Sequence, residues 1–315
     1  MATITKGVAG VDVAKANLEV YLLPSEKKLT VPNTKSGIKK ILPFLKQHDI
    51  KRVVFESTGG YEKLLFDAVE EANLEPWRVE PRRIKAFIAS EGIKAKTDAI
   101  DAKMIAHFGI EKEPSYSNKK SSQSESELRA LIRTRDDFVQ VQAKLKTQMQ
   151  QPVLFATCKQ SFEDVYLFVK KEISKIEDQI KAIIQQDQEL QKRAVLCESI
   201  PGIGLITAAV LLSEVPELGS LNERAITELV GLAPYAKESG NYKGKSYITD
   251  GRALPRKILY TNALTASRCN PQMKQFYQRL LDNGKPPKVA LVAVARKLLC
   301  LVNTLLRKEE AWHSA

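Results

Sequence analysis

Residues 8–23 read VAGVDVAKANLEVYLL, and this stretch predicts two adjacent β-strands joined by a turn at residues 14–17. Val11 and Val13 flank Asp12 in the first strand, and apolar residues alternate with others in the second. A short strand at residues 29–31 completes a meander. Asp12 therefore lies inside an apolar strand, where an unpaired ionised carboxylate is costly. It needs a cation or a proton.

The next hundred residues alternate between helical and strand patterns. Ser36 is expected to cap a helix that contains Pro43, a residue that kinks a helix or moves its start. The further elements, in chain order, are a buried strand at 52–56, a Gly-rich turn at 57–60, a helix at 61–72, a strand at 77–80 and a helix from 81. Strands first, then alternating strand and helix, is the order of a ribonuclease-H-like α/β layer.

A further helix is expected to begin after Thr97, which is a good N-cap residue. Ile100 and later apolar residues recur at a spacing of four, which puts Asp98 and Asp101 on adjacent turns of one face. Two carboxylates placed in this way can share a divalent cation. The alternative is that Asp98 only complements the helix N-terminus and Asp101 is solvated.

Two earlier acids look placed to complete the pair. Glu56 ends a predicted strand, at the edge where open α/β sheets hold their ligands, and Asp12 lies in the first strand. If Asp12, Glu56, Asp98 and Asp101 converge, their oxygens suit Mg²⁺ or Mn²⁺. Two such ions would stabilise the attacking and leaving oxygens of a phosphodiester displacement. The chain has no GxxxxGK[ST] phosphate loop, which argues against a nucleotide hydrolase.

Composition narrows the class of partner. The 315 residues are 43% hydrophobic, enough for two or three globular domains, and a formal charge of +12 favours a polyanionic partner. No uninterrupted apolar run approaches the roughly 18 residues of a membrane span, so a cytoplasmic location is expected. The four cysteines have no metal-ligand spacing and are expected to be reduced.

The middle of the chain, residues 122–194, is rich in Gln, Lys and Glu. Seven apolar residues from Phe162 to Ile183 step by four and three, which predicts long helices with a break near Gln151 and Pro152. The helical hairpin either links the end domains or pairs two chains as a coiled coil. An ordinary amphipathic pair packed within one chain explains the same pattern.

The third region opens with the sequence SIPGIG at residues 199–204. This pattern resembles a helix-hairpin-helix element, in which Gly202 and Gly204 would let backbone N–H groups approach a phosphate. A tight turn between two helices has the same pattern. A polar loop up to Gly251 and basic helices up to about Lys308 follow.

Seven ordered blocks of the sequence resemble one protein family. The first three are similar to the DEDD, RuvC-like domain of the insertion-sequence one-ten family of transposases, and the other four to its C-terminal transposase domain. The blocks are GVDVAK at 10–15, FESTGGY at 55–61, KTDAIDA at 96–102, SIPGIG at 199–204, GLAP at 231–234, ESG at 238–240 and RKILY at 256–260. The expected domains are a RuvC-like domain (1–120), a helical coiled-coil linker (121–195) and a mostly helical transposase domain (196–315).

The resemblance implies a function and roles for single residues. The metal-binding residues would be Asp12, Glu56, Asp98 and Asp101, and Ser239 would be the nucleophile that joins a DNA 5′ phosphate. A serine hydroxyl is a weak nucleophile and needs activation. Basic residues close to it in the sequence could hold the scissile phosphate; they are Lys237, Lys243, Lys245, Arg252 and Arg256. Pro255 suggests that a helix starts there, which weakens the case for Arg252 as a helical phosphate contact.

The family also implies partners and a cellular setting. Donor and target DNA would be chosen by base pairing with a structured non-coding RNA, the bridge RNA, and the protein would act as a homo-oligomer, a dimer or a tetramer in the synapse. No homeodomain, zinc-finger or basic-zipper pattern is present to read bases directly. The expected location is the cytoplasm of a prokaryote, at the nucleoid.

Two other functions fit parts of the sequence. In a RuvC-type junction-resolving nuclease, water would attack the phosphate and Ser239 would be only a turn residue. The C-terminal half argues against this, because a simple nuclease has no need of that domain. In a non-catalytic nucleic-acid-binding protein the four acids would be structural, and their convergence without a cation would strain the fold near neutral pH.

Overall fold

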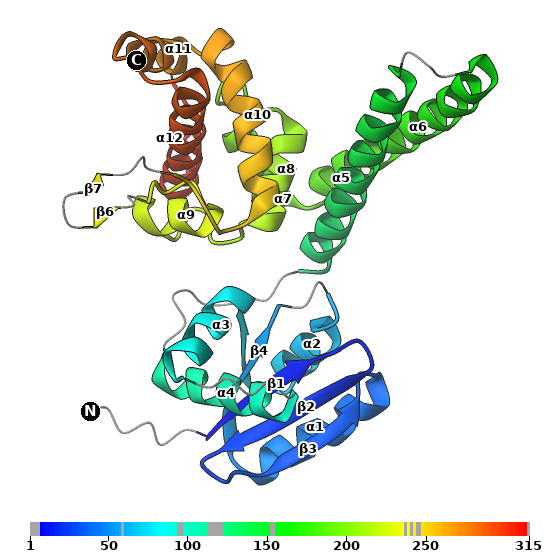
Figure 1. Ribbon diagram of the computed structural model, residues 1–315, viewed down its shortest axis with the longest axis vertical. Helices are drawn as coiled ribbons and strands as arrows, with labels where there is room; N and C mark the ends of the chain where they lie inside the picture. Colours follow the sequence, from blue (N-terminus) through cyan, green and yellow to red (C-terminus); the bar gives the residue numbers. More distant parts are fainter. Residues whose placement is uncertain are drawn as a thin grey trace. The chain divides into compact units, whose positions relative to one another are not determined.

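The computed structural model describes residues 7–57, 60–92, 98–112, 122–151, 155–235, 238–239, 242–243 and 247–313. The chain forms two compact units, unit 1 at Met1–Lys120 and unit 2 at Ser121–Ala315. Figure 1 shows unit 1 in blue to cyan and unit 2 in green to red.

A five-stranded mixed sheet forms the centre of unit 1, in the order β3-β2-β1-β4-β5. Strand β1 pairs antiparallel with β2, as β2 does with β3, whereas β1, β4 and β5 run parallel. The strands are β1 (Gly7–Val13), β2 (Asn17–Leu23), β3 (Lys28–Pro32), β4 (Ile50–Glu56) and β5 (Glu75–Val79). The predicted meander followed by strand–helix alternation is confirmed, and unit 1 is a mixed α/β layer.

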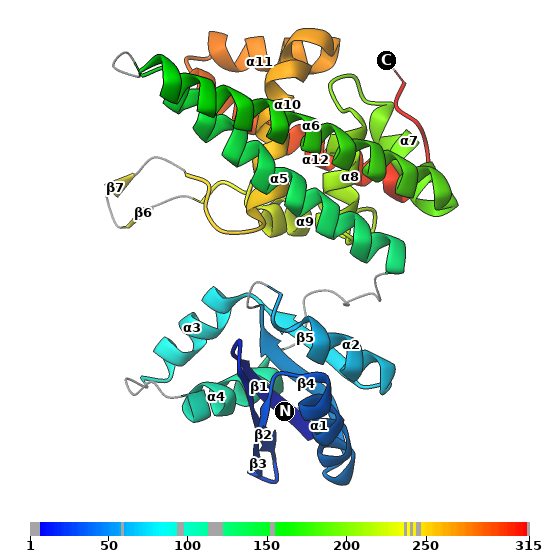
Figure 2. The same ribbon diagram turned by 90° about the vertical axis from the view of Figure 1, so that its right-hand side faces the viewer.

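Helices cover both faces of this sheet (Figure 2). They are α1 (Lys35–Gln47) and α2 (Lys63–Glu71) on one face, and α3 (Pro81–Ser90) and α4 (Asp98–Glu111) on the other. Alternate residues of β1 face the two layers: Val11 packs with α1 and α2, and Val8 packs with α3 and α4. Each face of β1 is therefore buried, which explains why this strand is apolar at nearly every position.

The predicted N-cap of α1 is wrong, and the predicted N-cap of α4 lies outside the described residues. Thr34, rather than Ser36, caps α1, because its hydroxyl accepts a hydrogen bond from the Gly37 N–H at 3.2 Å. Pro43 lies inside the same helix. Thr97, the expected cap of α4, lies outside the described residues, as do two residues of the Gly-rich turn after β4.

The described residues of unit 2 are helical apart from one small hairpin and the loops between elements. Its elements are α5 (Gln123–Met149), α6 (Ala156–Gln186), α7 (Gln188–Glu198), α8 (Leu205–Glu214), α9 (Glu223–Val230), β6 (Glu238–Ser239), β7 (Tyr242–Lys243), α10 (Ala253–Cys269), α11 (Pro271–Asp282) and α12 (Pro287–Lys308). Helices α5 and α6 form the predicted hairpin and pack against each other within the chain (Figure 1). Pairing of two chains through a coiled coil, and a separate linker domain, stay predictions.

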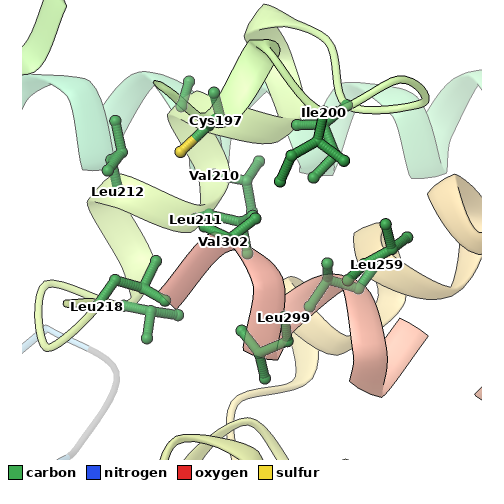
Figure 3. Close-up of a cluster of buried hydrophobic side chains, with 14 of the residues drawn as sticks. Cys197, Ile200, Val210, Leu211, Leu212, Leu218, Leu259, Leu299 and Val302 are labelled. Carbon is green, nitrogen blue, oxygen red and sulfur yellow. The ribbon is translucent and has the colours of Figure 1, made fainter. Parts of the chain in front are cut away.

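A single large core holds unit 2 together. Figure 3 shows buried side chains from α7, α8, α10 and α12 that meet in it, including Cys197, Leu211, Leu259 and Leu299. The four cysteines are free, as expected from their spacing. The α7–α8 turn is present at the predicted place, but its identity as a helix-hairpin-helix element stays a prediction.

Helix α12 is long and apolar enough to cross a membrane by length and composition alone. Half of its most apolar stretch is buried inside the protein, where it contributes Val294, Leu298 and Val302 to the core of unit 2. A buried core helix passes the same test as a membrane span, so its composition is explained by packing.

Candidate active-site residues

The acids of unit 1 lie at one end of its parallel strands. Strands β1 and β4 are neighbours, and their last paired positions are Val11 and Phe55. Asp12 and Glu56 are the next residue on each strand, so the two acids stand side by side at the carboxyl edge. This is the edge at which open α/β sheets bind ligands.

Both acids belong to the sheet face that α4 covers. Val11 and Phe55 pack into the α1/α2 layer, so the residues that follow them, Asp12 and Glu56, face the other way. Gly10, two residues before Asp12, is the point of closest approach: a Cβ there would lie 2.3 Å from both the Ala102 carbonyl oxygen and the Ala106 nitrogen. The α4 backbone thus rests directly on β1.

This contact brings a third acid to the same edge. Asp101 directly precedes Ala102 in the first turns of α4, and it is half-buried like Asp12 and Glu56. Asp98 is the first residue of the helix, but its side chain lies outside the description. Among the described side chains, no three Asp, Glu, His or Cys residues form a group that could hold a metal ion. The described part of the site is therefore a set of oxygen donors at one edge, without a closed cage.

Ser239 lies on the small hairpin of unit 2. It belongs to β6, where it pairs with Tyr242 of β7, and the backbones of Tyr235 and Tyr247 bond to each other at the base of the hairpin. The side chains of Ser239 and Lys243 are outside the description, and Lys237 and Lys245 lie outside the described residues altogether.

Arg252 is engaged within the fold. It is the N-cap residue of α10, and its guanidinium group donates to both carboxylate oxygens of Glu217, at 2.5 and 2.7 Å, and to the Glu214 carbonyl at 2.8 Å. Glu217 is only 8% exposed. Helix α10 begins at Ala253, two residues before the expected start, and Pro255 fits in the first turn, where its N–H would have no helical partner. These contacts give Arg252 a structural role that the sequence did not suggest.

Arg256 lies one turn further along α10 and holds the segment on which the hairpin stands. Its guanidinium group donates to the carbonyls of Val230 and Asp250. A cavity of about 510 Å³ lies beside it. The cavity has an apolar wall and three cationic residues, and it is lined by Leu232, Ile248, Ala253, Arg256, Lys257, Tyr260, Thr261, Lys288 and Val292.

The two glycines of the α7–α8 turn differ in their surroundings. Gly202 has a φ of +102°, and a Cβ there would lie within 2.8 Å of the Ala266 side chain, so packing against α10 is sufficient to require glycine. Gly204 is the N-cap residue of α8, and a Cβ there would meet nothing within 4 Å. Of the two, Gly204 has the open space that a backbone contact to phosphate needs.

Several residues that shape these sites were not predicted. They are Glu217, Asn33, Glu62, Tyr260 and Lys288. Glu62 is 5% exposed and accepts a hydrogen bond from the Gly60 N–H at 2.9 Å. The one signal that the sequence holds for Glu62 is an acid just after a Gly-rich turn; its burial is seen only in the structure. Burial raises the pKa of the Cys197 thiol to about 12, which keeps it protonated and unsuited to nucleophilic chemistry.

Comparisons with known proteins identify the class of enzyme. Residues 9–158 match the IS110 DEDD family model, which is described as a transposase, and residues 194–278 match the model described as transposase IS116/IS110/IS902 family. The chain is therefore a transposase, an enzyme that cuts and joins DNA. It belongs to the IS110 family, the insertion-sequence family that its motifs resemble.

Curated relatives agree with this assignment. The pilin gene-inverting protein of Moraxella bovis is 28% identical over 316 residues, which cover 97% of each chain, and the protein of the same name from Moraxella lacunata is equally similar. An uncharacterized 42 kDa protein of insertion element IS900 from Mycobacterium paratuberculosis is 28% identical over 155 residues, covering 46% of this chain and 38% of that protein.

Among solved structures, a T. thermophilus RuvC in complex with a Holliday junction substrate is similar over 32% of this chain and 90% of that chain. The sequence identity is 17% and the TM-score is 0.26. A TM-score this low supports no conclusion about this chain.

Proposed function

We propose that this transposase is a bridge-RNA-guided recombinase that cuts and rejoins donor and target DNA through a covalent link to Ser239, with a divalent metal site at Asp12, Glu56, Asp98 and Asp101. The observation that carries the proposal is the meeting of Asp12, Glu56 and the first turns of α4 at one sheet edge. It occurs in a chain that matches IS110-family models at both ends.

The acids fit a divalent cation by their chemistry. Carboxylate oxygens at the open end of a parallel sheet are hard donors and suit Mg²⁺ or Mn²⁺. When bound, the metal would neutralise charge on the phosphate and lower the pKa of an attacking hydroxyl. Asp12 and Glu56 would be held in place by the sheet, and Asp98 and Asp101 by α4, so the donor set would need little rearrangement on binding.

The proposed covalent step balances without any external energy source. The Ser239 Oγ attacks the phosphorus of a DNA phosphodiester, the Oγ–P bond forms, and the bond from phosphorus to the 3′ oxygen breaks. The serine proton leaves with the departing 3′ oxygen, which becomes a 3′ hydroxyl. Attack by the 3′ hydroxyl of a second strand then reverses the chemistry and frees Ser239. The number of phosphodiester bonds is conserved, as a recombinase requires.

The surroundings of the hairpin support phosphate binding near Ser239. Lys257 and Lys288 line the cavity beside Arg256, with the Lys257 ammonium group 2.6 Å from a carboxylate oxygen of Asp136, and Tyr260 lines the same cavity. Cationic groups at the mouth of an apolar cavity can hold a phosphate while a base stacks on the aromatic ring. We assign contacts with the DNA phosphate backbone to Lys237, Lys243 and Lys245 on the sequence pattern alone.

The remaining parts of the proposal follow from the family. A composite site needs the metal-binding domain (1–120) and the transposase domain (196–315) brought together, within one chain or between protomers, with the helices of 121–195 as the connection. The Moraxella relatives are named for inverting a pilin gene, a reaction that cuts and rejoins DNA. Charge of +12 supports contacts to DNA and RNA backbones, and the expected place of action is the nucleoid.

The test is a search for the covalent intermediate. Purified protein is incubated with Mg²⁺, the RNA transcribed from the element's flank and labelled donor and target DNA, and a denaturing gel is examined for a protein–DNA adduct. We expect an adduct that requires the RNA and is lost in both Ser239→Ala and Asp12→Ala. Matched controls are Ser174→Ala and Asp67→Ala, which change exposed residues of the same types on helices α6 and α2.

Two results would overturn parts of the proposal. Cleaved DNA without an adduct, unaffected by Ser239→Ala but abolished by Asp12→Ala, would identify a RuvC-type nuclease. An adduct that forms equally well without RNA would contradict guidance by a bridge RNA. The proposal that Ser239 is the nucleophile would not be affected.

A further inference from the structure

Asn33 connects the two segments that follow the acidic strands of unit 1. It lies directly after β3, and its side-chain amide nitrogen donates to the carbonyl oxygens of Ala14 and Tyr61, both at 3.0 Å. Ala14 comes two residues after Asp12, and Tyr61 comes five residues after Glu56. One amide group therefore spans from the end of β1 to the end of the β4–α2 turn.

Backbone hydrogen bonds fix Asn33 itself on the β1 side. Its N–H donates to the Ala16 carbonyl at 2.8 Å, and the Ala14 N–H donates to the Asn17 carbonyl at 3.0 Å. The β1–β2 turn and the residue after β3 thus form one rigid corner. From this corner the Asn33 side chain reaches across to the turn after β4.

The turn after β4 is held on its other side as well. The Ser57 N–H donates to the Val79 carbonyl at 3.0 Å, and the buried Glu62 carboxylate accepts from the Gly60 N–H at 2.9 Å. Arg78 of β5 lies 3.6 Å from the same carboxylate. The segment that leaves Glu56 is therefore tied to β5 by these contacts and to β1 by Asn33.

The chemistry of this link is specific to asparagine. Two donors on one nitrogen are needed to reach both carbonyls, and the isosteric aspartate has only acceptors. The link also has a cost, because the buried Asn33 Oδ1 has no hydrogen-bond partner among the described residues. A buried acceptor without a partner destabilises the folded state, so stability alone is a poor reason for this residue.

We propose that Asn33 is a positioning residue for the metal site: it holds the segments after Asp12 and Glu56 at a fixed separation, so that the two carboxylates can bind the same divalent cation. This inference rests on the proposed metal site. It adds a residue that lies outside the acids themselves and acts only through their spacing. Residues of this kind typically change metal affinity by tenfold to a hundredfold.

The test measures metal binding directly. The full chain and its Asn33→Ala and Asn33→Asp variants are titrated with Mn²⁺ alone, and bound ion is followed by electron paramagnetic resonance, with Asp12→Ala defining the component that belongs to the site. We expect the Mn²⁺ midpoint to rise at least about tenfold in both variants. The rate of DNA cleavage at low metal should fall, and excess Mn²⁺ should restore most of it.

A neighbouring residue provides the matched control. Thr34→Ala removes the N-cap of α1 and destabilises that helix, but the Thr34 hydroxyl bonds to Ser36 and Gly37, which belong to neither acidic segment. If Asn33 only stabilises the fold, its variants will lower the melting temperature and leave the Mn²⁺ midpoint unchanged, as Thr34→Ala does. If Asn33→Ala fails to fold, Asn33→Ser, which keeps one donor, serves for the same titration.

The outcomes separate this inference from the proposed function. Binding of Mn²⁺ that requires Asp12 but has the same midpoint in the Asn33 variants would overturn the role of Asn33 and leave the metal site intact. Absence of any Asp12-dependent Mn²⁺ binding in the unchanged chain would overturn the metal site, and the role of Asn33 with it.

Discussion

The acidic edge of unit 1 and the Ser239 hairpin of unit 2 are built in different ways. The acids lie on long, regular elements, with α4 resting on β1 at Gly10 and two parallel strands ending side by side. Ser239 lies on a strand of two residues, and the loop behind it is held by arginines that reach distant carbonyls and a buried carboxylate.

The difference shows what each half of the proposed site would require. A metal site needs several donors at fixed distances, and a sheet edge covered by a helix supplies them with little loss of entropy on binding. A nucleophile that must reach a DNA strand is suited to a short hairpin, and the base of this one is fixed by the paired backbones of Tyr235 and Tyr247. The comparison can be tested by disturbing one region and following the other.

The largest expected effect concerns the core beneath the hairpin. Burial raises the pKa of Cys197 from 9.0 to about 12, so at pH 8 its thiolate fraction is about a thousandfold lower than that of a thiol with the ordinary value. Only the thiolate reacts, and the side chain is fully buried. We expect a maleimide to label the exposed Cys158 and Cys269 at least about a thousandfold faster than Cys197, as read by mass spectrometry of the peptides.

The same measurement reports on unit 2 alone, because all four cysteines belong to it. Labelling of Cys197 at a rate within tenfold of Cys158 would mean that the core of unit 2 opens readily. Unit 2 would then lack the firmly packed core from which the hairpin is proposed to project.

The next effect is the loss of the acidic edge. Gly10→Val places a branched side chain where even a Cβ would lie 2.3 Å from the α4 backbone, so α4 must move away from β1. Overpacking typically costs about 1–3 kcal/mol and occasionally more, and a clash with backbone atoms belongs at the upper end of that range. We expect the melting transition of unit 1, followed by fluorescence of the buried Trp77 in a Trp312→Phe background, to fall by roughly 10 °C, using about 4 °C per kcal/mol for a domain of this size.

Two controls accompany this variant. Gly204→Ala adds a Cβ in open space on unit 2 and should shift the melting of unit 1 by nothing measurable. Cys197 should stay protected in Gly10→Val, because the two units have separate cores. A Gly10→Val protein that melts like the unchanged chain would show that α4 does not rest on β1 as described.

The features that could be predicted from the sequence are those with local signals. Asp12 and Glu56 were found because apolar alternation identifies a strand and its end. The first turns of α4 were found because polar and apolar residues repeat at helical spacing. The wrong cap of α1 shows the limit of such signals: Thr34 and Ser36 are both good N-cap residues, and only the geometry at Gly37 decides between them.

The features that could not be predicted depend on partners far along the chain. Arg252 and Glu217 are 35 residues apart, and Asn33 meets a carbonyl 28 residues away. Residue 202 has to be glycine partly because Ala266 packs against it and leaves no room for a Cβ. Each of these contacts is set by how helices and turns meet in three dimensions, and no periodicity in the sequence records that.

The smallest expected effect tests what holds the hairpin loop in place. Glu217→Ala removes a carboxylate that is 8% exposed and leaves the Arg252 guanidinium without its two-oxygen partner, which should lower the free energy of unfolding of unit 2 by about 2–3 kcal/mol. Urea denaturation followed by far-UV circular dichroism measures this loss. The matched control is Lys192→Ala, which breaks the exposed pair with Glu309 and should leave the free energy of unfolding nearly unchanged. Arg252→Ala then decides between two roles. If Arg252 is structural, the variant should be destabilised about as much as Glu217→Ala, and its affinity for DNA should depend on salt as in the unchanged chain. In the alternative result, the free energy of unfolding is unchanged and the slope of log affinity for DNA against log salt concentration falls by about one, the loss of one phosphate contact. Arg252 then binds the DNA backbone, and other residues must hold the loop.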